Sequence, residues 1–176
     1  MNAIKNFVAT WKSRGYEKGD TQKFWLTFLR DILQVDKPEK YVEFEVPVKL
    51  EHTNFIDAFF PDTKVIVEQK SLQKNLSEKI LQSDKNYLTP YEQAQKYILG
   101  LPVSMHPTQI IVCNFQEFLI YDMEHKVGRV GEKISRLRLP HRQNKKFGTL
   151  TTTKSPQITS VGLSSLFMFL RFNVLN

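Results

Sequence analysis

Two adjacent apolar runs carry charged residues at positions where core residues are the rule. The first, at residues 55–60, reads Phe-Ile-Asp-Ala-Phe-Phe and holds Asp57; the second reads Val-Ile-Val-Glu-Gln-Lys and ends in Glu68 and Lys70. A carboxylate that is buried without a partner costs several kcal/mol or takes up a proton. These three residues therefore form a functional site, or else they are charges of an edge strand that face water.

Two carboxylates that converge among phenylalanines need a cation between them. Hard oxygen ligands from two strands, together with a nearby main-chain carbonyl and water, suit magnesium, with manganese as a substitute. Lys70 follows Glu68 by two residues, so both side chains lie on the same side of an extended strand. A metal that polarises a phosphoryl oxygen, beside an ammonium group that stabilises negative charge, is suited to phosphodiester hydrolysis.

The turn between the two runs decides whether the carboxylates meet. With a four-residue loop at 61–64, or a two-residue loop within it, Asp57 lies directly opposite Glu68. With a turn formed by residues 61–62, Asp57 faces Ile66 and lies diagonal to Glu68. A loop of odd length would place the two carboxylates on opposite faces of the sheet.

Apolar periodicity predicts an α/β (α+β) fold, with a mixed central sheet of about five strands flanked by helices in the order ααβββαββ. The expected helices are near residues 1–14, 21–34 and 90–99, and the expected strands are near 41–50, 54–60, 64–70, 108–115 and 117–123. Asp20 is the expected N-cap of the second helix. Thr89 and Glu92 form a capping-box pattern for the third helix, which Gly100 ends. The polar segment at 73–87 predicts a loop or a mobile lid.

The charge of the chain is distributed unevenly. The net charge is +7, yet residues 126–176 hold ten Lys or Arg and one acidic residue, whereas residues 1–125 hold fifteen and seventeen. We therefore expect one folded domain at residues 1–125, followed by a basic tail at 126–176 that is disordered or is not the native continuation. The tail either binds nucleic acid non-specifically or is a solvated segment without a partner.

Cysteine content and hydropathy indicate a cytoplasmic protein. The single cysteine, Cys113, stands in an apolar run and has no partner within the chain for a disulfide. The N-terminus has no signal-peptide pattern, and Arg171 interrupts the longest apolar run, so we expect no membrane segment.

The arrangement of Asp57, Glu68 and Lys70 resembles the PD-(D/E)xK nuclease superfamily, in which an Asp on one hairpin strand and Glu-x-Lys on the next bind the catalytic metal. Residues 14–124 are also similar to the N-terminal nuclease region of fused type II (IIG/IIL) restriction-modification enzymes, which cut DNA and methylate adenine with one chain. The blocks that carry this similarity are FWLTFLRDILQVDKPEKYVEFEVPVKL, FIDAFFPDTKVIVEQKS, LTPYEQAQKYILGLP and IIVCNFQEFLIYDM.

The resemblance implies a restriction-endonuclease-like fold and a magnesium-dependent endonuclease acting on double-stranded DNA. It implies that Asp57 and Glu68 are metal ligands, with the main-chain carbonyl of Gln69 as a third. It also implies that Lys70 is the catalytic base or an orienting cation.

Three further residues or pairs stay open as candidates. Gln93 and Tyr97 fit the Gln-x-x-x-Tyr element of some nucleases in this superfamily, and their spacing puts both on one face of a helix. The alternative is a polar and an aromatic residue at the rim of a packed helix. Glu43 or Glu45 could add one more acid to the site.

The sequence departs from those enzymes after residue 124. It contains no glycine-rich loop for S-adenosylmethionine and no Asn-Pro-Pro-Tyr motif. We therefore expect a truncated or recombined product whose methyltransferase and target-recognition regions are elsewhere. The alternative function is a non-catalytic or regulatory N-terminal module of a DNA adenine methyltransferase, or an inactive remnant.

Overall fold

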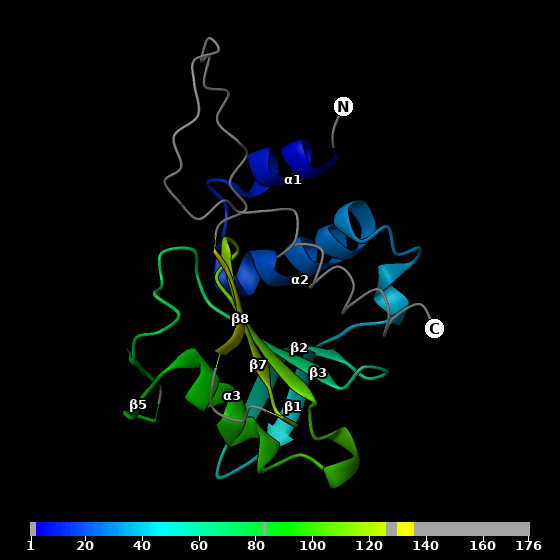
Figure 1. Cartoon of the computed structure of the whole chain (residues 1–176). Helices are drawn as coiled ribbons and strands as arrows, with labels where there is room; N and C mark the ends of the chain where they lie inside the picture. The colour runs from blue at the N-terminus through cyan, green and yellow to red at the C-terminus, as the bar shows by residue number, and fades with distance from the viewer. Residues whose placement is uncertain (1–2, 83, 126–129, 136–176) are drawn as a thin grey trace, which may run out of the picture.

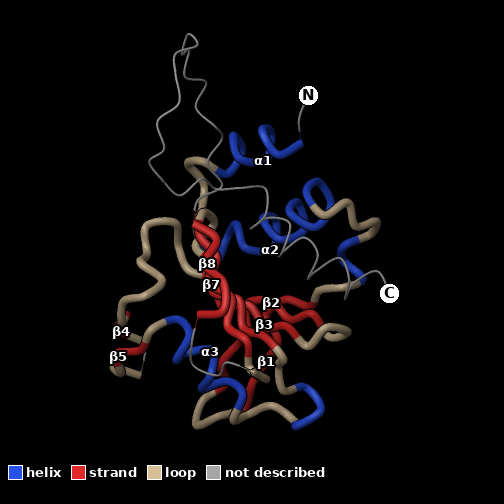
Figure 2. Tube along the Cα trace, viewed as in Figure 1, coloured by secondary structure: helices blue, strands red, loops and turns tan. Residues whose placement is uncertain are grey.

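A mixed six-stranded sheet runs through the protein, and helices cover both of its faces (Figures 1 and 2). The computed structural model describes residues 3–82 and 84–125, and it describes 130–135 for the main chain alone. The strand order is β1-β2-β3-β6-β7-β8. Strands β3 and β6 pair in parallel, and the other neighbouring pairs are antiparallel. The expected mixed sheet flanked by helices is confirmed.

The order of the larger elements up to residue 125 also agrees with the expected ααβββαββ. The helices are α1 (Ala3–Trp11), α2 (Glu17–Thr27) and α3 (Pro90–Ile98), with a π-helical turn η1 (Phe28–Ile32) after α2 and short 3-10 turns at Pro38–Lys40 and Val103–Met105. The strands are β1 (Glu43–Lys49), β2 (Thr53–Phe60), β3 (Val65–Gln69), β4 (Ile80–Leu81), β5 (Tyr87–Leu88), β6 (Gln109–Cys113), β7 (Glu117–Asp122) and β8 (Val130–Ser135).

Two pieces of β-structure were not expected. Strands β4 and β5 form a small antiparallel pair in the segment where we expected a loop or a lid. Strand β8 pairs antiparallel with β7, so the sheet continues past residue 125, where we placed the end of the domain. Its sequence, Val-Gly-Glu-Lys-Ile-Ser, is polar as edge strands often are, and composition therefore did not reveal it. The rest of the expected tail lies outside the described residues.

Helix α2 begins one turn earlier than expected. Its N-cap residue is Tyr16, which makes no side-chain cap, and Asp20 lies within the helix. The Asp20 carboxylate accepts a hydrogen bond from the Tyr16 N–H at 3.1 Å and pairs with Arg14 at 2.7 Å. Asp20 thus accepts a hydrogen bond from the N-cap residue while it lies within the helix itself. The prediction of Asp20 as the N-cap is therefore wrong, and Glu17 is the first residue of the helix.

The start and end of α3 are as the sequence indicated. The Thr89 side chain accepts from the Glu92 N–H at 3.2 Å, and the Glu92 carboxylate accepts from the Thr89 N–H at 2.8 Å, which completes the capping box. Gly100 follows the helix where β1 passes close by. A Cβ at this position would lie 2.5 Å from the Val48 side chain and 2.8 Å from the Lys49 carbonyl oxygen, so only glycine fits.

Each face of the sheet has its own hydrophobic core. Helices α1 and α2 pack against one face through a cluster of rings that includes Phe24, Trp25 and Phe118. Helix α3 packs against the other face through Tyr91, Ala94 and Tyr97. Strand β3 is buried along its whole length between these two layers. No helix in the described ranges is long and apolar enough to cross a membrane.

Candidate functional site

The β2–β3 hairpin has the register that brings the two carboxylates together. Its four-residue loop pairs Phe60 with Val65 and Ala58 with Val67. The same register puts Asp57 opposite Glu68, which is the first of the two even-loop alternatives. Asp57 also contacts β3 directly, because its Oδ2 accepts the Gln69 N–H at 2.6 Å. The candidate site therefore lies at the open end of the β2–β3 hairpin, away from its turn.

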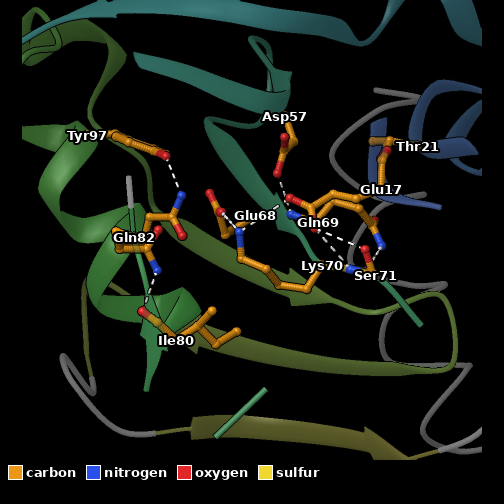
Figure 3. Close-up of polar contacts among 11 residues, drawn as sticks. Glu17, Thr21, Asp57, Glu68, Gln69, Lys70, Ser71, Ile80, Gln82 and Tyr97 are labelled. Carbon is orange, nitrogen blue, oxygen red and sulfur yellow. Dashed lines mark hydrogen bonds and ion pairs between the residues drawn. The ribbon is translucent and has the colours of Figure 1, made fainter. Parts of the chain in front are cut away.

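Glu68 and Lys70 form a buried ion pair at the end of β3. The Lys70 Nζ donates to Glu68 Oε1 at 2.5 Å, and the two residues are 7% and 2% exposed (Figure 3). The main chain holds Lys70 in place, since its N–H donates to the Cys113 carbonyl of β6 at 2.7 Å. Lys70 thus compensates the charge of Glu68, one of the two carboxylates.

A third carboxylate, Glu17 of α2, completes the acidic side of the site and was missed by the sequence analysis. Its Oε1 lies 3.6 Å from Lys70 Nζ, and its Oε2 accepts the Ser71 N–H at 3.1 Å (Figure 3). Our assignment of the helix start to Asp20 had left Glu17 in a linker. No pattern in the sequence marked Glu17, because α2 begins without a side-chain cap at its N-cap residue, Tyr16.

Gln69, between the two charged residues of β3, ties the site to α2. Its side chain is fully buried; its Oε1 accepts from Trp25 Nε1 at 3.0 Å, and its Nε2 donates to the Lys70 carbonyl at 3.2 Å. The main chain of Gln69 therefore has a fixed position next to Asp57. We had considered only its carbonyl, and no pattern in the sequence links Trp25 to it.

The structure places Gln93 and Tyr97 together on α3, facing β3. The Gln93 Nε2 donates to the Tyr97 hydroxyl at 2.6 Å, and Figure 3 shows this hydroxyl directed toward the side of Glu68. Gln93 Oε1 is buried and has no hydrogen-bond partner among the described residues. A buried acceptor without a hydrogen bond lowers the stability of the fold. A ligand of the site that donates a hydrogen bond to this oxygen would remove that cost.

Of the two further acids, Glu45 is the one beside Asp57. The β1–β2 register pairs Phe44 with Ala58 and Val46 with Ile56, and thus puts Glu45 opposite Asp57, whereas Glu43 pairs further along the strand. Glu45 has a positive φ of 52°, which is unusual for a residue other than glycine. The backbone of β1 is therefore distorted at the level of the site.

Burial governs the ionisation of the acids. Desolvation raises the pKa of Asp57 from 3.8 to about 7, although the Gln69 N–H and Lys70 oppose the rise. Desolvation also raises the pKa of Glu68 from 4.5 to about 8, against the attraction of Lys70. Burial acts to lower the pKa of Lys70, but Glu68 and Glu17 raise it overall, so the ammonium group stays charged. The pKa of Tyr97 is raised by burial and by the charge of Glu68.

The donor set fits a divalent cation with oxygen ligands. Asp57, Glu68 and Glu17 surround a single ammonium group, Lys70, so the ionised site has more negative than positive charge. Burial raises the pKa of Asp57 and of Glu68, and a bound cation would lower the free-energy cost of ionising both carboxyl groups. No group of three or more His, Cys, Asp or Glu in the described ranges is arranged as a metal site. A cation here would therefore depend on two carboxylates and the main chain.

The restriction-modification context follows from family membership. The model of the family described as MmeI, N-terminal domain, matches residues 1–160, and the chain belongs to this family. That membership supports a place in the N-terminal region of a type II restriction-modification enzyme. Neither the curated proteins nor the solved structures contain a match to the chain.

Proposed function

We propose that this chain is a magnesium-dependent DNA endonuclease domain of the PD-(D/E)xK type, which hydrolyses phosphodiester bonds of double-stranded DNA. One observation carries the proposal. Asp57 and Glu68 come together from adjacent strands, and the Lys70 ammonium group is paired with Glu68 beside them. Membership of the MmeI N-terminal family supports the DNA substrate. A buried cluster of this kind has a stability cost, and function is the usual reason for keeping it.

Asp57 and Glu68 would hold the cation, with the main-chain carbonyl of Gln69 as a third ligand. When bound, magnesium or manganese supplies Lewis-acid polarisation of the phosphate and lowers the pKa of a water. The protein contributes rigidity, because the Trp25 hydrogen bond to Gln69 and the Asp57 hydrogen bond to its N–H fix the ligands relative to one another.

Lys70 orients the attacking water and stabilises the negative charge that develops on the phosphate. Glu17 keeps this ammonium group near the site while Glu68 serves as a ligand, since it already lies 3.6 Å from Lys70 Nζ. On α3, the Tyr97 hydroxyl and the Gln93 Oε1 offer a donor and an acceptor to the substrate or to ordered water.

Plasmid cleavage tests this proposal. Supercoiled DNA is incubated with magnesium or manganese and wild-type protein, Asp57→Ala, Lys70→Ala or the control Asp62→Asn, which changes an exposed acid in the β2–β3 loop. We expect nicked or linear DNA from wild type and Asp62→Asn, and a loss of at least about 100-fold in the two site variants. Equal cleavage by all four proteins, or none by wild type, would support the non-catalytic module instead.

A further inference from the structure

The segment between the candidate metal site and α3 is a built structure beside the site. It leaves β3 directly after Lys70 and ends at Thr89, the N-cap of the helix that carries Gln93 and Tyr97. Its second half contains the two-stranded ribbon of β4 and β5, in which Ile80 pairs with Leu88 and Leu81 with Tyr87. In Figure 1 this ribbon lies at the outer edge of the molecule, beyond the start of α3.

Several contacts hold the segment against the rest of the fold. Leu76 is 1% exposed and packs in the same core cluster as Tyr97. The Asn114 side chain donates to the Lys74 carbonyl at 2.8 Å. At the far end, the Asp84 carboxylate binds Lys96 of α3 at 2.6 Å. The ribbon is therefore presented on a firm base.

The outer surface of the ribbon is apolar and basic. Leu81 and Tyr87 are cross-strand neighbours, and they are 55% and 61% exposed, so they form one continuous apolar patch rather than two scattered residues. Lys85, between the two strands, and Lys74, six residues before the ribbon, are also exposed, and neither has an ion-pair partner in the part of the chain that the structure describes. Of the two acids of the segment, Asp84 is paired with Lys96, whereas Glu78 accepts from the neutral Asn75 amide at 2.7 Å and keeps its charge.

We propose that the β4–β5 ribbon is a DNA-contacting element that holds the duplex next to the cleavage site. This inference rests on the proposed nuclease function. A two-stranded ribbon fits a DNA groove, where apolar side chains contact sugars and base edges. Unpaired lysines beside such a patch match the phosphates that flank a groove. The ribbon is joined to α3 through Thr89 and through the Asp84–Lys96 ion pair, so a duplex that lies over the site and along α3 would meet Leu81 and Tyr87.

A thiol-protection experiment tests this contact in the full chain. The single native cysteine, Cys113, is fully buried and its pKa is raised to about 12 by burial, so it does not compete for alkylation. Leu81→Cys introduces a reactive thiol on the ribbon. The matched control is Leu99→Cys at the other end of α3, where the native side chain is 83% exposed. Iodoacetamide alkylation is followed with and without a mixed-sequence 30-base-pair duplex, in EDTA so that no cleavage occurs.

With the duplex at about ten times its dissociation constant, about nine tenths of the protein is bound. We therefore expect alkylation at position 81 to slow about tenfold when DNA is added. Alkylation at the control position 99 should change less than about twofold. Equal rates at position 81 with and without DNA overturn the ribbon contact, and they would be expected if the patch holds a protein. A duplex that does not bind at all overturns it as well. Each outcome is distinct from failure of the nuclease proposal, which is read from cleavage by Asp57→Ala.

Discussion

Replacement of Asp57 by asparagine should stabilise the metal-free protein at alkaline pH. The carboxylate is half-buried beside the buried Glu68, with one ammonium group near three acids, and its pKa is raised to about 7. Asparagine keeps the shape and retains an oxygen that can accept the Gln69 N–H. The substitution therefore removes a charge whose ionisation is unfavourable and leaves the backbone contact in place.

The sign and the window follow from the two ionisation states. Well below pH 3.8 the carboxyl is protonated in both the folded and the unfolded chain, and it contributes no difference. As the pH rises toward 7, the unfolded chain releases this proton while the folded protein keeps it, so wild-type stability falls through that window. Above pH 7 the full cost is present, about 4 kcal/mol at most, since each tenfold change in the ionisation constant is worth about 1.4 kcal/mol.

Part of this gain is not realised, because Asp57 is only half-buried and solvent screens its charge. We expect Asp57→Asn to raise the free energy of unfolding by about 2 to 3 kcal/mol at pH 8. For a chain of this size that corresponds to about 4 to 12 °C in Tm. At pH 4 the difference should nearly vanish.

Thermal unfolding in EDTA at a series of pH values measures both quantities. Asp62→Asn, in the exposed loop of the same hairpin, is the control and should match wild type throughout. An Asp57→Asn protein that is less stable than wild type at pH 8, or a difference that does not grow between pH 4 and pH 7, would refute this reasoning about the buried charge.

Other substitutions test the contacts around the site. Trp25→Phe should cost about 1 to 3 kcal/mol in urea unfolding, because it leaves the Gln69 Oε1 buried without its donor; a cost no larger than that of an exposed substitution would contradict this role. Glu17→Gln should lower the rate of plasmid cleavage about tenfold or more while Asp20→Asn, one turn along α2, retains most of it, and a wild-type rate in Glu17→Gln would remove Glu17 from the site. Thr89→Ala should cost about 1 kcal/mol through loss of the α3 cap, to be measured by urea unfolding beside Thr10→Ala.

The hairpin at the centre of the site could be predicted well from the sequence. The alternation of apolar residues around Asp57 and Glu68 defined both strands, and an even loop was sufficient to put the carboxylates on one face. The choice between the two even registers could not be made, because it depends on how the loop at residues 61–64 closes. The capping box at Thr89 and Glu92 was equally readable, since its chemistry is local.

What the sequence concealed depends on contacts between distant segments. Trp25 and Gln69 are 44 residues apart, and no periodicity relates them. Glu17 was hidden because α2 begins without a side-chain cap at its N-cap residue, Tyr16. Strand β8 was hidden by the basic, polar composition of its segment. The distortion at Glu45 occurs in a run that alternates regularly in sequence, so only the backbone reveals it.

The binding of a cation by Asp57 and Glu68 is the claim on which the proposed function rests, and manganese titration measures it most directly. Electron paramagnetic resonance of free Mn²⁺ at about pH 8 should show one ion bound per chain in wild type and in Asp62→Asn. Binding should be lost or weakened at least about tenfold in both Asp57→Asn and Glu68→Gln. Manganese binding of wild-type strength in these two variants would contradict a metal site between the strands.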